Sequence, residues 1–142
     1  MARIVWALLI GTLAAGAVGC AGAQSADDTT MSGVRREAEV VAPALRAAMA
    51  HGGGTAAAFR EAAEAAGLPA GAAGVPVDVQ TRGLTAADRA RFALDGVTVR
   101  HFSPGGQRMA AVVRDAQALR ALARLPQVRY IAPAYGPAVS DE

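Results

Sequence analysis

Four short segments in the second half of the chain have the composition of β-strands. They share β-branched residues and partial alternation of apolar and polar positions, and they are residues 77–80, 97–102, 109–113 and 128–131. Residues 84–94 and 115–125 carry apolar side chains three or four positions apart, which is typical of amphipathic helices. The pattern is therefore strand, helix, strand, and it occurs twice.

Local signals support the ends of these elements. Leu84 is placed to pack as a hydrophobic staple before a capping box of Thr85 and Asp88. Asp115 is the predicted N-cap of the second helix, and Pro126 ends that helix. The turn at residues 103–106 joins the two copies as a hairpin. These features predict an α+β domain over residues 77–133 with the ferredoxin-like order β-α-β-β-α-β.

Right-handed crossovers put both predicted helices on one face of a four-stranded antiparallel sheet and leave the other face bare. The side chains predicted to lie beneath the helices are Val97, Val99 and Tyr130. Those predicted on the bare face are Phe102, Ile131 and either Val112 or Val113. Apolar residues grouped on an exposed face indicate a docking surface. In the alternative arrangement, residues 34–66 fold back and cover this face.

The segment before the domain is predicted to be helical. Residues 34–50 carry an apolar stripe, but Pro43 interrupts it, so the firmer helix begins at Pro43. The sequence His51-Gly-Gly-Gly ends that helix, and residues 55–66 form another short helix. The remainder up to residue 76 is a predicted linker rich in Gly, Ala and Pro, and residues 20–33 are a predicted flexible tether.

The first residues are typical of an export signal. A short basic start precedes an uncharged apolar run from Ile4 to Val18, which suits a signal peptide of residues 1–19. Ala17-Val-Gly-Cys20 is similar to a bacterial lipobox, in which Cys20 is acylated and anchors the protein to a membrane. Cleavage after Ala23 by a general signal peptidase is one alternative and would release a soluble protein, and an uncleaved membrane anchor is the other. All three predict an exported protein, periplasmic or extracellular if it is not anchored.

Charge and composition exclude several functions. The 142 residues include 14 basic ones, all arginine, and the net charge of +2 is too small to indicate nucleic acid as a partner. Residues 77–132 contain nine arginines against four aspartates, which we interpret as solvated helix faces. No Gly-x-Ser-x-Gly elbow accompanies His51-Gly-Gly-Gly, and His101 has no ligand neighbour at metal spacing. We expect no enzyme activity, no cofactor and no metal.

The end of the second copy carries a family resemblance. Residues 119–135 are Leu-Arg-Ala-Leu-Ala-Arg-Leu-Pro-Gln-Val-Arg-Tyr-Ile-Ala-Pro-Ala-Tyr. This resembles the end of the inhibitor-type prodomain of subtilisin-like serine proteases, where a leucine-bearing helix leads through a Pro-x-Val turn to a final strand. The resemblance extends more weakly over residues 77–134.

The resemblance implies a partner and a way of binding it. Such prodomains pack the bare face of their sheet on two surface helices of the protease and lay their C-terminal tail in the substrate cleft. They act as folding chaperones and inhibitors. By position, the docking face would include Phe102, Val112 and Ile131. The cleft-binding tail, within residues 134–142 and the end of the last strand, would include Ala132, Pro133, Ala134, Tyr135 and Gly136.

The sequence contains no protease domain, so we expect the protein to act in trans on a subtilisin-like protease, as a monomer when unbound. The alternative is a non-inhibitory module of the cell envelope that binds another protein with the same fold.

Lipidation can be tested directly. We expect Cys20→Ala to shift the protein from the membrane fraction to the soluble fraction, because the acyl chains have lost their attachment atom. Membrane fractionation that does not change in the Cys20→Ala variant would exclude a lipid anchor at this position.

Overall fold

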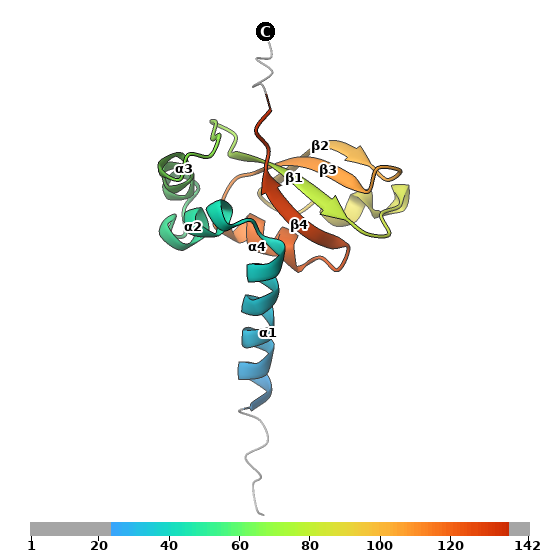
Figure 1. Cartoon of the computed structure of the whole chain (residues 1–142), viewed down its shortest axis with the longest axis horizontal. Coiled ribbons are helices and arrows are strands. Elements are labelled where there is room, and N and C mark those ends of the chain that lie inside the picture. The colour runs from blue at the N-terminus through green and yellow to red at the C-terminus, as the bar shows by residue number, and fades with distance from the viewer. Residues whose placement is uncertain (1–23, 137–142) are drawn as a thin grey trace, which may run out of the picture.

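The computed structural model describes residues 24–136 of the chain, an α+β arrangement with an open four-stranded sheet (Figure 1). The elements in order are α1 (Gln24–Val40), α2 (Pro43–His51), α3 (Ala56–Ala65), β1 (Val75–Thr81), the 3-10 helix η1 (Ala86–Phe92), β2 (Val97–Ser103), β3 (Arg108–Val113), α4 (Ala116–Arg124) and β4 (Val128–Pro133). All neighbouring strands are antiparallel, and their order is β2-β3-β1-β4. This sheet is compatible with the predicted ferredoxin-like arrangement.

α4 covers one face of the sheet. It begins as predicted after Asp115, whose Oδ1 accepts a hydrogen bond from the Ala118 amide at 2.8 Å. Its apolar stripe, with Leu119 and Leu122 fully buried, belongs to the same hydrophobic cluster as the buried alternate residues of β1. The core therefore lies between α4 and one face of the sheet.

The helix predicted in the first of the two strand-helix-strand copies is wrong in type. The structure has only the 3-10 helix η1 in place of an α-helix over residues 84–94. Phe92 is the one buried residue of η1, so this segment has little apolar surface to bury. Tertiary packing of an apolar face provides most of the stability of helices in proteins.

The predicted pairing of Thr85 with Asp88 is nevertheless present. The Asp88 carboxylate accepts hydrogen bonds from the Thr85 hydroxyl at 2.6 Å and from the Thr85 amide at 2.9 Å. These two bonds hold the pKa of Asp88 below its ordinary value. The interaction organises the start of η1 although the helix that follows is short.

A bulge in β2 changes which residues lie in the core. The register passes from Val99 opposite Ala111 to His101 opposite Ala110, so Arg100 is an extra residue. Val97 and Val99 lie on the helix-covered face, as predicted. Beyond the bulge Phe102 returns to that same face, pairs with Met109 and packs edge-on against Phe92 at a ring distance of 6.0 Å. The prediction that Phe102 lies on the bare face is wrong.

A second register shift, between Gln80 and Thr81, has the same effect on β4. Ile131 lies opposite Val79 and is fully buried, whereas Tyr130 lies opposite Gln80 on the other face. Both placements are the reverse of those predicted. The period of two along a strand fails where one strand contributes an extra residue.

The N-terminal helices pack beside the sheet. The structure has helix from Gln24 onward, so the tether predicted for residues 20–33 is wrong over its described part. This stretch lacks an apolar stripe, which is the signal that a sequence pattern can detect. α1 contacts α4 through Arg36, which donates to the Leu125 carbonyl at 3.0 Å, and through Arg120, 3.6 Å from Glu37.

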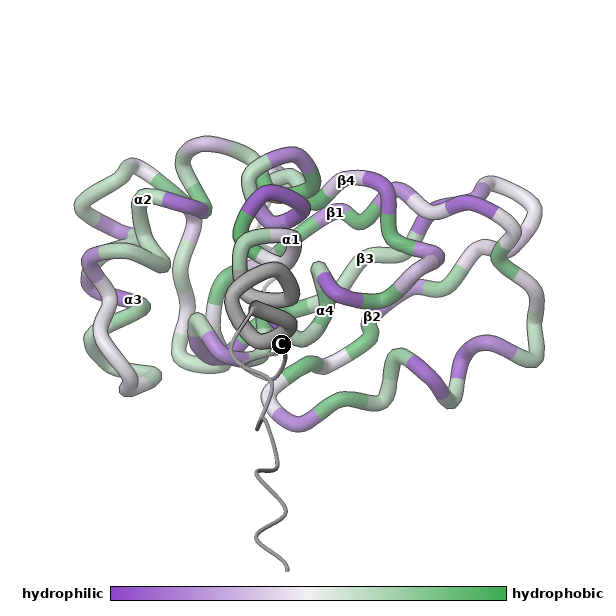
Figure 2. The backbone as a smooth tube through the Cα atoms, turned by 90° about the horizontal axis from the view of Figure 1, so that it is seen from below, coloured by the Kyte–Doolittle hydropathy of each residue, from purple (hydrophilic) through white to green (hydrophobic). Residues whose placement is uncertain are grey.

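The connection between α1 and α2 closes the outer edge of β4. Val41 forms a parallel bridge with Ile131, and the Ala42 amide donates to the Ile131 carbonyl at 2.9 Å. α2 then begins at Pro43, as predicted. In Figure 2, α1 lies between the α2–α3 pair and the strands, so residues 34–66 flank the sheet and do not cover its bare face.

α2 and α3 share one core with the sheet. Leu45 and Phe59 are fully buried in the same hydrophobic cluster as Val77 of β1. The predicted linker also ends earlier than residue 76, because Val75 and Pro76 belong to β1.

Gly52 allows α2 and α3 to approach closely. A Cβ at Gly52 would lie 2.6 Å from the Phe59 Cα and 2.7 Å from the Ala48 carbonyl oxygen. We expect Gly52→Ala to lower the free energy of unfolding by about 1–3 kcal/mol, because backbone atoms must move apart. Urea denaturation of the two proteins measures this difference.

Gly54→Ala is the matched control, since nothing lies within 4 Å of a Cβ at that position. We expect it to unfold like the unsubstituted protein. Equal stability of the Gly52 and Gly54 variants would contradict the close packing of α2 on α3.

Candidate docking face

The face of the sheet opposite α4 is open to solvent, and the strand register arranges its side chains in three rows. The first row contains Thr98, Val112 and Pro76. The second contains His101, Ala110, Asp78 and Ala132. The third contains Ser103, Arg108, Gln80 and Tyr130. We call these residues the open face.

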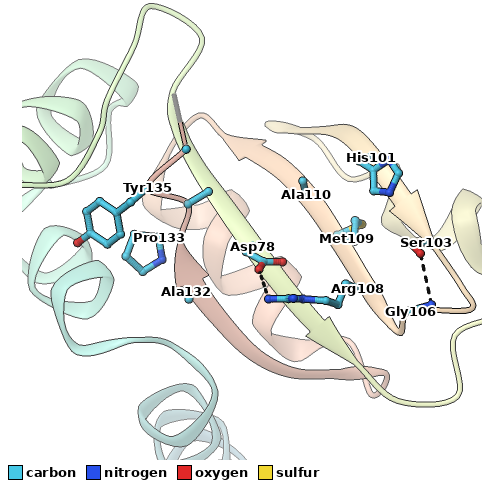
Figure 3. Close-up of a pocket in the computed structure, with 12 residues that line it drawn as sticks. Asp78, His101, Ser103, Gly106, Arg108, Met109, Ala110, Ala132, Pro133 and Tyr135 are labelled. Carbon is cyan, nitrogen blue, oxygen red and sulfur yellow. Dashed lines mark hydrogen bonds and ion pairs between the residues drawn. The ribbon is translucent and has the colours of Figure 1, made fainter. Parts of the chain in front are cut away.

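Small side chains occupy the centre of the open face. Ala110 and Ala132 flank Asp78 on the two neighbouring strands. The Asp78 carboxylate accepts a hydrogen bond from Arg108 Nη2 at 2.6 Å (Figure 3). The two side chains are 34% and 59% exposed, so this ion pair adds at most about 1 kcal/mol to stability. Its main effect is to hold two charged groups flat against the sheet.

The open face is hollowed between β2 and the C-terminal segment. His101 and Ser103 border the hollow on the β2 side, and Tyr135 and Gly136 border it on the opposite side. Ala110 forms part of its floor (Figure 3). The hollow is wide and open to solvent, which suits a protein surface better than an enclosed small molecule.

The residues predicted as a cleft-binding tail divide into two groups. Ala132 and Pro133 belong to β4, and the Ala134 amide donates to the Pro76 carbonyl at 3.0 Å, so these three are held by β1. Tyr135 and Gly136 leave the sheet, and Tyr135 is 70% exposed. The free part of the tail therefore begins at Tyr135. Residues 137–142 lie outside the described residues.

Of the three residues predicted for docking, only Val112 lies on the open face. Phe102 and Ile131 lie on the covered face and belong to the core, because the register shifts in β2 and β4 bring them there. Sequence reasoning missed Asp78 and Ala110. The alternation of residues 77–80 already placed Asp78 on the opposite face from Val77 and Val79, but the sequence did not show that Asp78 would lie at the centre of the docking face.

Ser103, His101 and Asp78 share the open face but do not form a nucleophile and base. Asp78 and His101 are separated by β3, a spacing of roughly 10 Å across two strand intervals. Asp78 is bound by Arg108, and Ser103 Oγ accepts a hydrogen bond from the Gly106 amide at 3.3 Å. Within the described residues no group of three or more His, Cys, Asp or Glu side chains is placed to hold a metal ion.

His51 has a structural position at the end of α2. Its Nδ1 lies 2.8 Å from the Ala47 carbonyl oxygen, and Gly53 beyond it has a φ of 55°. This geometry fits the prediction that His51-Gly-Gly-Gly ends a helix. It does not bring His51 to the open face.

Cys20 and the predicted leader lie outside the described residues. Of the helices within residues 24–136, none has the length and apolar composition needed to cross a bilayer.

The comparisons with known proteins give no family for this chain. No family model matches the sequence, and the searches of curated proteins and of solved structures find no match either. The function must therefore be argued from the residues and geometry of the open face and of the segment beside it.

Proposed function

We propose that this protein is exported, binds a subtilisin-like serine protease in trans, and inhibits it or assists its folding. One observation carries the proposal: an extended C-terminal segment leaves β4 at the border of an open sheet face with small residues at its centre. The last strand and the helix before it are also the part of the sequence that resembles protease prodomains. A lipid on Cys20 would attach the protein to the cell envelope, and helices α1 to α3 would connect that anchor to the sheet.

We further infer that the sheet and its helices form a ferredoxin-like module. The strand order β2-β3-β1-β4 with antiparallel neighbours supports this inference. η1 takes the place of the first helix, and α4 is the second. The replacement of an α-helix by η1 affects the covered face and leaves the open face unchanged.

The composition of the open face suits contact with helices of a partner. Ala110 and Ala132 do not project far, so a helix can approach the backbones of β3 and β4 closely on either side of Asp78. Val112 and Pro76 add apolar surface in the neighbouring row. The resemblance implies that two protease helices occupy this position.

The size of the open face favours a contribution of the tail to binding. Four strands spaced about 4.8 Å apart and three rows of residues give a planar area on the order of 300–400 Å². A stable interface buries about 800 Å² on each partner. Contacts of the tail from Tyr135 onward, lying in the protease cleft, would supply the difference.

Removal of residues 135–142 tests the role of the tail. We expect the inhibition constant against a subtilisin-type protease to rise at least about tenfold, because the cleft contacts are lost while the sheet retains its hydrogen bond at Ala134. Titration of residues 24–142 and 24–134 against the same enzyme measures this. If neither protein inhibits at micromolar concentration with an intact circular dichroism spectrum, the proposed function is wrong.

Ala110→Arg tests the open face. A long charged side chain at the centre of the face should separate the sheet from the partner, and we expect inhibition to weaken by about tenfold or more. Gln117→Arg adds the same side chain at an exposed position of α4 and is the control. Equal inhibition by both variants would show that the protease does not contact the open face.

A further inference from the structure

Arginine gathers at the hairpin end of the sheet, where β1 ends, β2 turns into β3 and β4 begins. Backbone hydrogen bonds join these segments: the Thr81 amide donates to the Gln107 carbonyl at 2.9 Å, and the Arg82 amide donates to the Gln127 carbonyl at 2.8 Å. Residues 79–82, 103–109 and 127–130 contain three arginines and no Asp or Glu. We call Arg82, Arg108 and Arg129 the arginine end.

All three side chains are exposed. Within residues 31–136, the side chains of Arg82 and Arg129 make no hydrogen bond or ion pair, and Arg108 bonds only to Asp78. Arg129 is the extra residue of the register shift in β4, which leaves it without a cross-strand partner. Two of the three charges are therefore available to an external group.

The arginine end is continuous with the open face. A polar hollow lies there, lined by Gln80, Thr81, Gly106, Gln107, Arg108 and Arg129. It shares Gly106 and Arg108 with the hollow of the docking face. A partner that covers the open face would therefore also reach Arg108 and Arg129, and Arg82 lies on the segment bonded beside them.

Repulsion between the arginine side chains determines which sign of charge a partner surface should carry here. Two like charges about 10 Å apart repel by only about 0.4 kcal/mol in water, but the repulsion grows when a partner excludes water. A basic partner surface would add to it. Carboxylates would remove it and could accept paired hydrogen bonds from the planar guanidinium groups.

We propose that the arginine end binds aspartate or glutamate side chains on the protein that docks on the open face. The position of that protein rests on the proposed function. The partner surface is thus acidic where it meets the hairpin end and apolar where it meets Ala110 and Ala132. Nucleic acid fits less well, because Asp78 lies in the middle of the face and would repel phosphates. Tyr130 and His101 are the aromatic side chains of the three rows, and they lie on outer strands at opposite sides of the face.

A binding assay that needs no protease tests this proposal. The probe is a fluorescein-labelled short peptide of alternating Glu and Gly, and a Gln and Gly peptide is the neutral control. We expect fluorescence anisotropy to show binding of the acidic peptide at low salt that weakens as sodium chloride is added. Arg82→Gln and Arg129→Gln should each weaken it about two- to fivefold.

Arg35→Gln is the matched control, because it removes the same charge from an exposed position on α1. We expect it to bind the acidic peptide like the unsubstituted protein. An equal loss in the Arg35 variant, or no preference for the acidic over the neutral peptide, would overturn the proposal. So would tighter binding of a short oligothymidine that depends on Arg82 and Arg129, which would assign the surface to nucleic acid.

Protease inhibition separates this inference from the proposed function. If the acidic peptide binds as expected and no subtilisin-type enzyme is inhibited, the proposed function fails and the arginine end remains an acidic-peptide site. If a protease is inhibited equally by the unsubstituted protein, Arg82→Gln and Arg129→Gln at low salt, and the peptide does not bind, the inference fails and the proposed function remains.

Discussion

β1 is hydrogen-bonded on both sides, and its register with β3 and β4 determines the two faces of the sheet. Val79 lies opposite both Met109 and Ile131, so one row of apolar residues crosses the sheet beneath the helix. Asp78 lies one residue earlier and faces the other way, between Ala110 and Ala132. A slip of one residue would exchange these sets, bury a carboxylate and expose the core.

The two register shifts adapt the outer strands to this central strand. In β2 the extra residue is Arg100, and in β4 it is Arg129. Each shift returns a large apolar side chain to the core, Phe102 in one strand and Ile131 in the other. Each shift also places an exposed arginine on its strand, and Arg129 belongs to the arginine end. The same local irregularity therefore completes the core and contributes charge to the surface.

The N-terminal helices leave the open face of the sheet accessible and pack beside β4. The connection at Val41 and Ala42 pairs with Ile131 and covers the outer edge of β4. An unpaired edge strand can associate with other chains, so this closure shields the β4 edge, while β2 forms the opposite edge of the sheet. The N-terminal end of α1 and the departing C-terminal segment lie at opposite ends of the molecule (Figure 1). An anchor before α1 would thus present the tail away from its attachment.

The sequence by itself determined the kinds and order of most elements: four strands, the helix after Asp115 and the restart at Pro43. Alternation, caps and proline act locally, so their consequences can be predicted without knowing the rest of the chain. The faces of Phe102, Tyr130 and Ile131 depended on extra residues in strand pairing, which only long-range register reveals. The type of helix within residues 84–94 was also decided by the tertiary structure, because it depends on how much apolar surface this segment buries against the rest of the fold. Of the candidate site, Val112 was one of two alternatives, and the tail was expected from Ala132, whereas strand pairing and the hydrogen bond at Ala134 keep residues 132–134 on the sheet. The convergence of the segments that carry Arg82, Arg108 and Arg129 was decided by tertiary structure, because three separate parts of the chain are joined there.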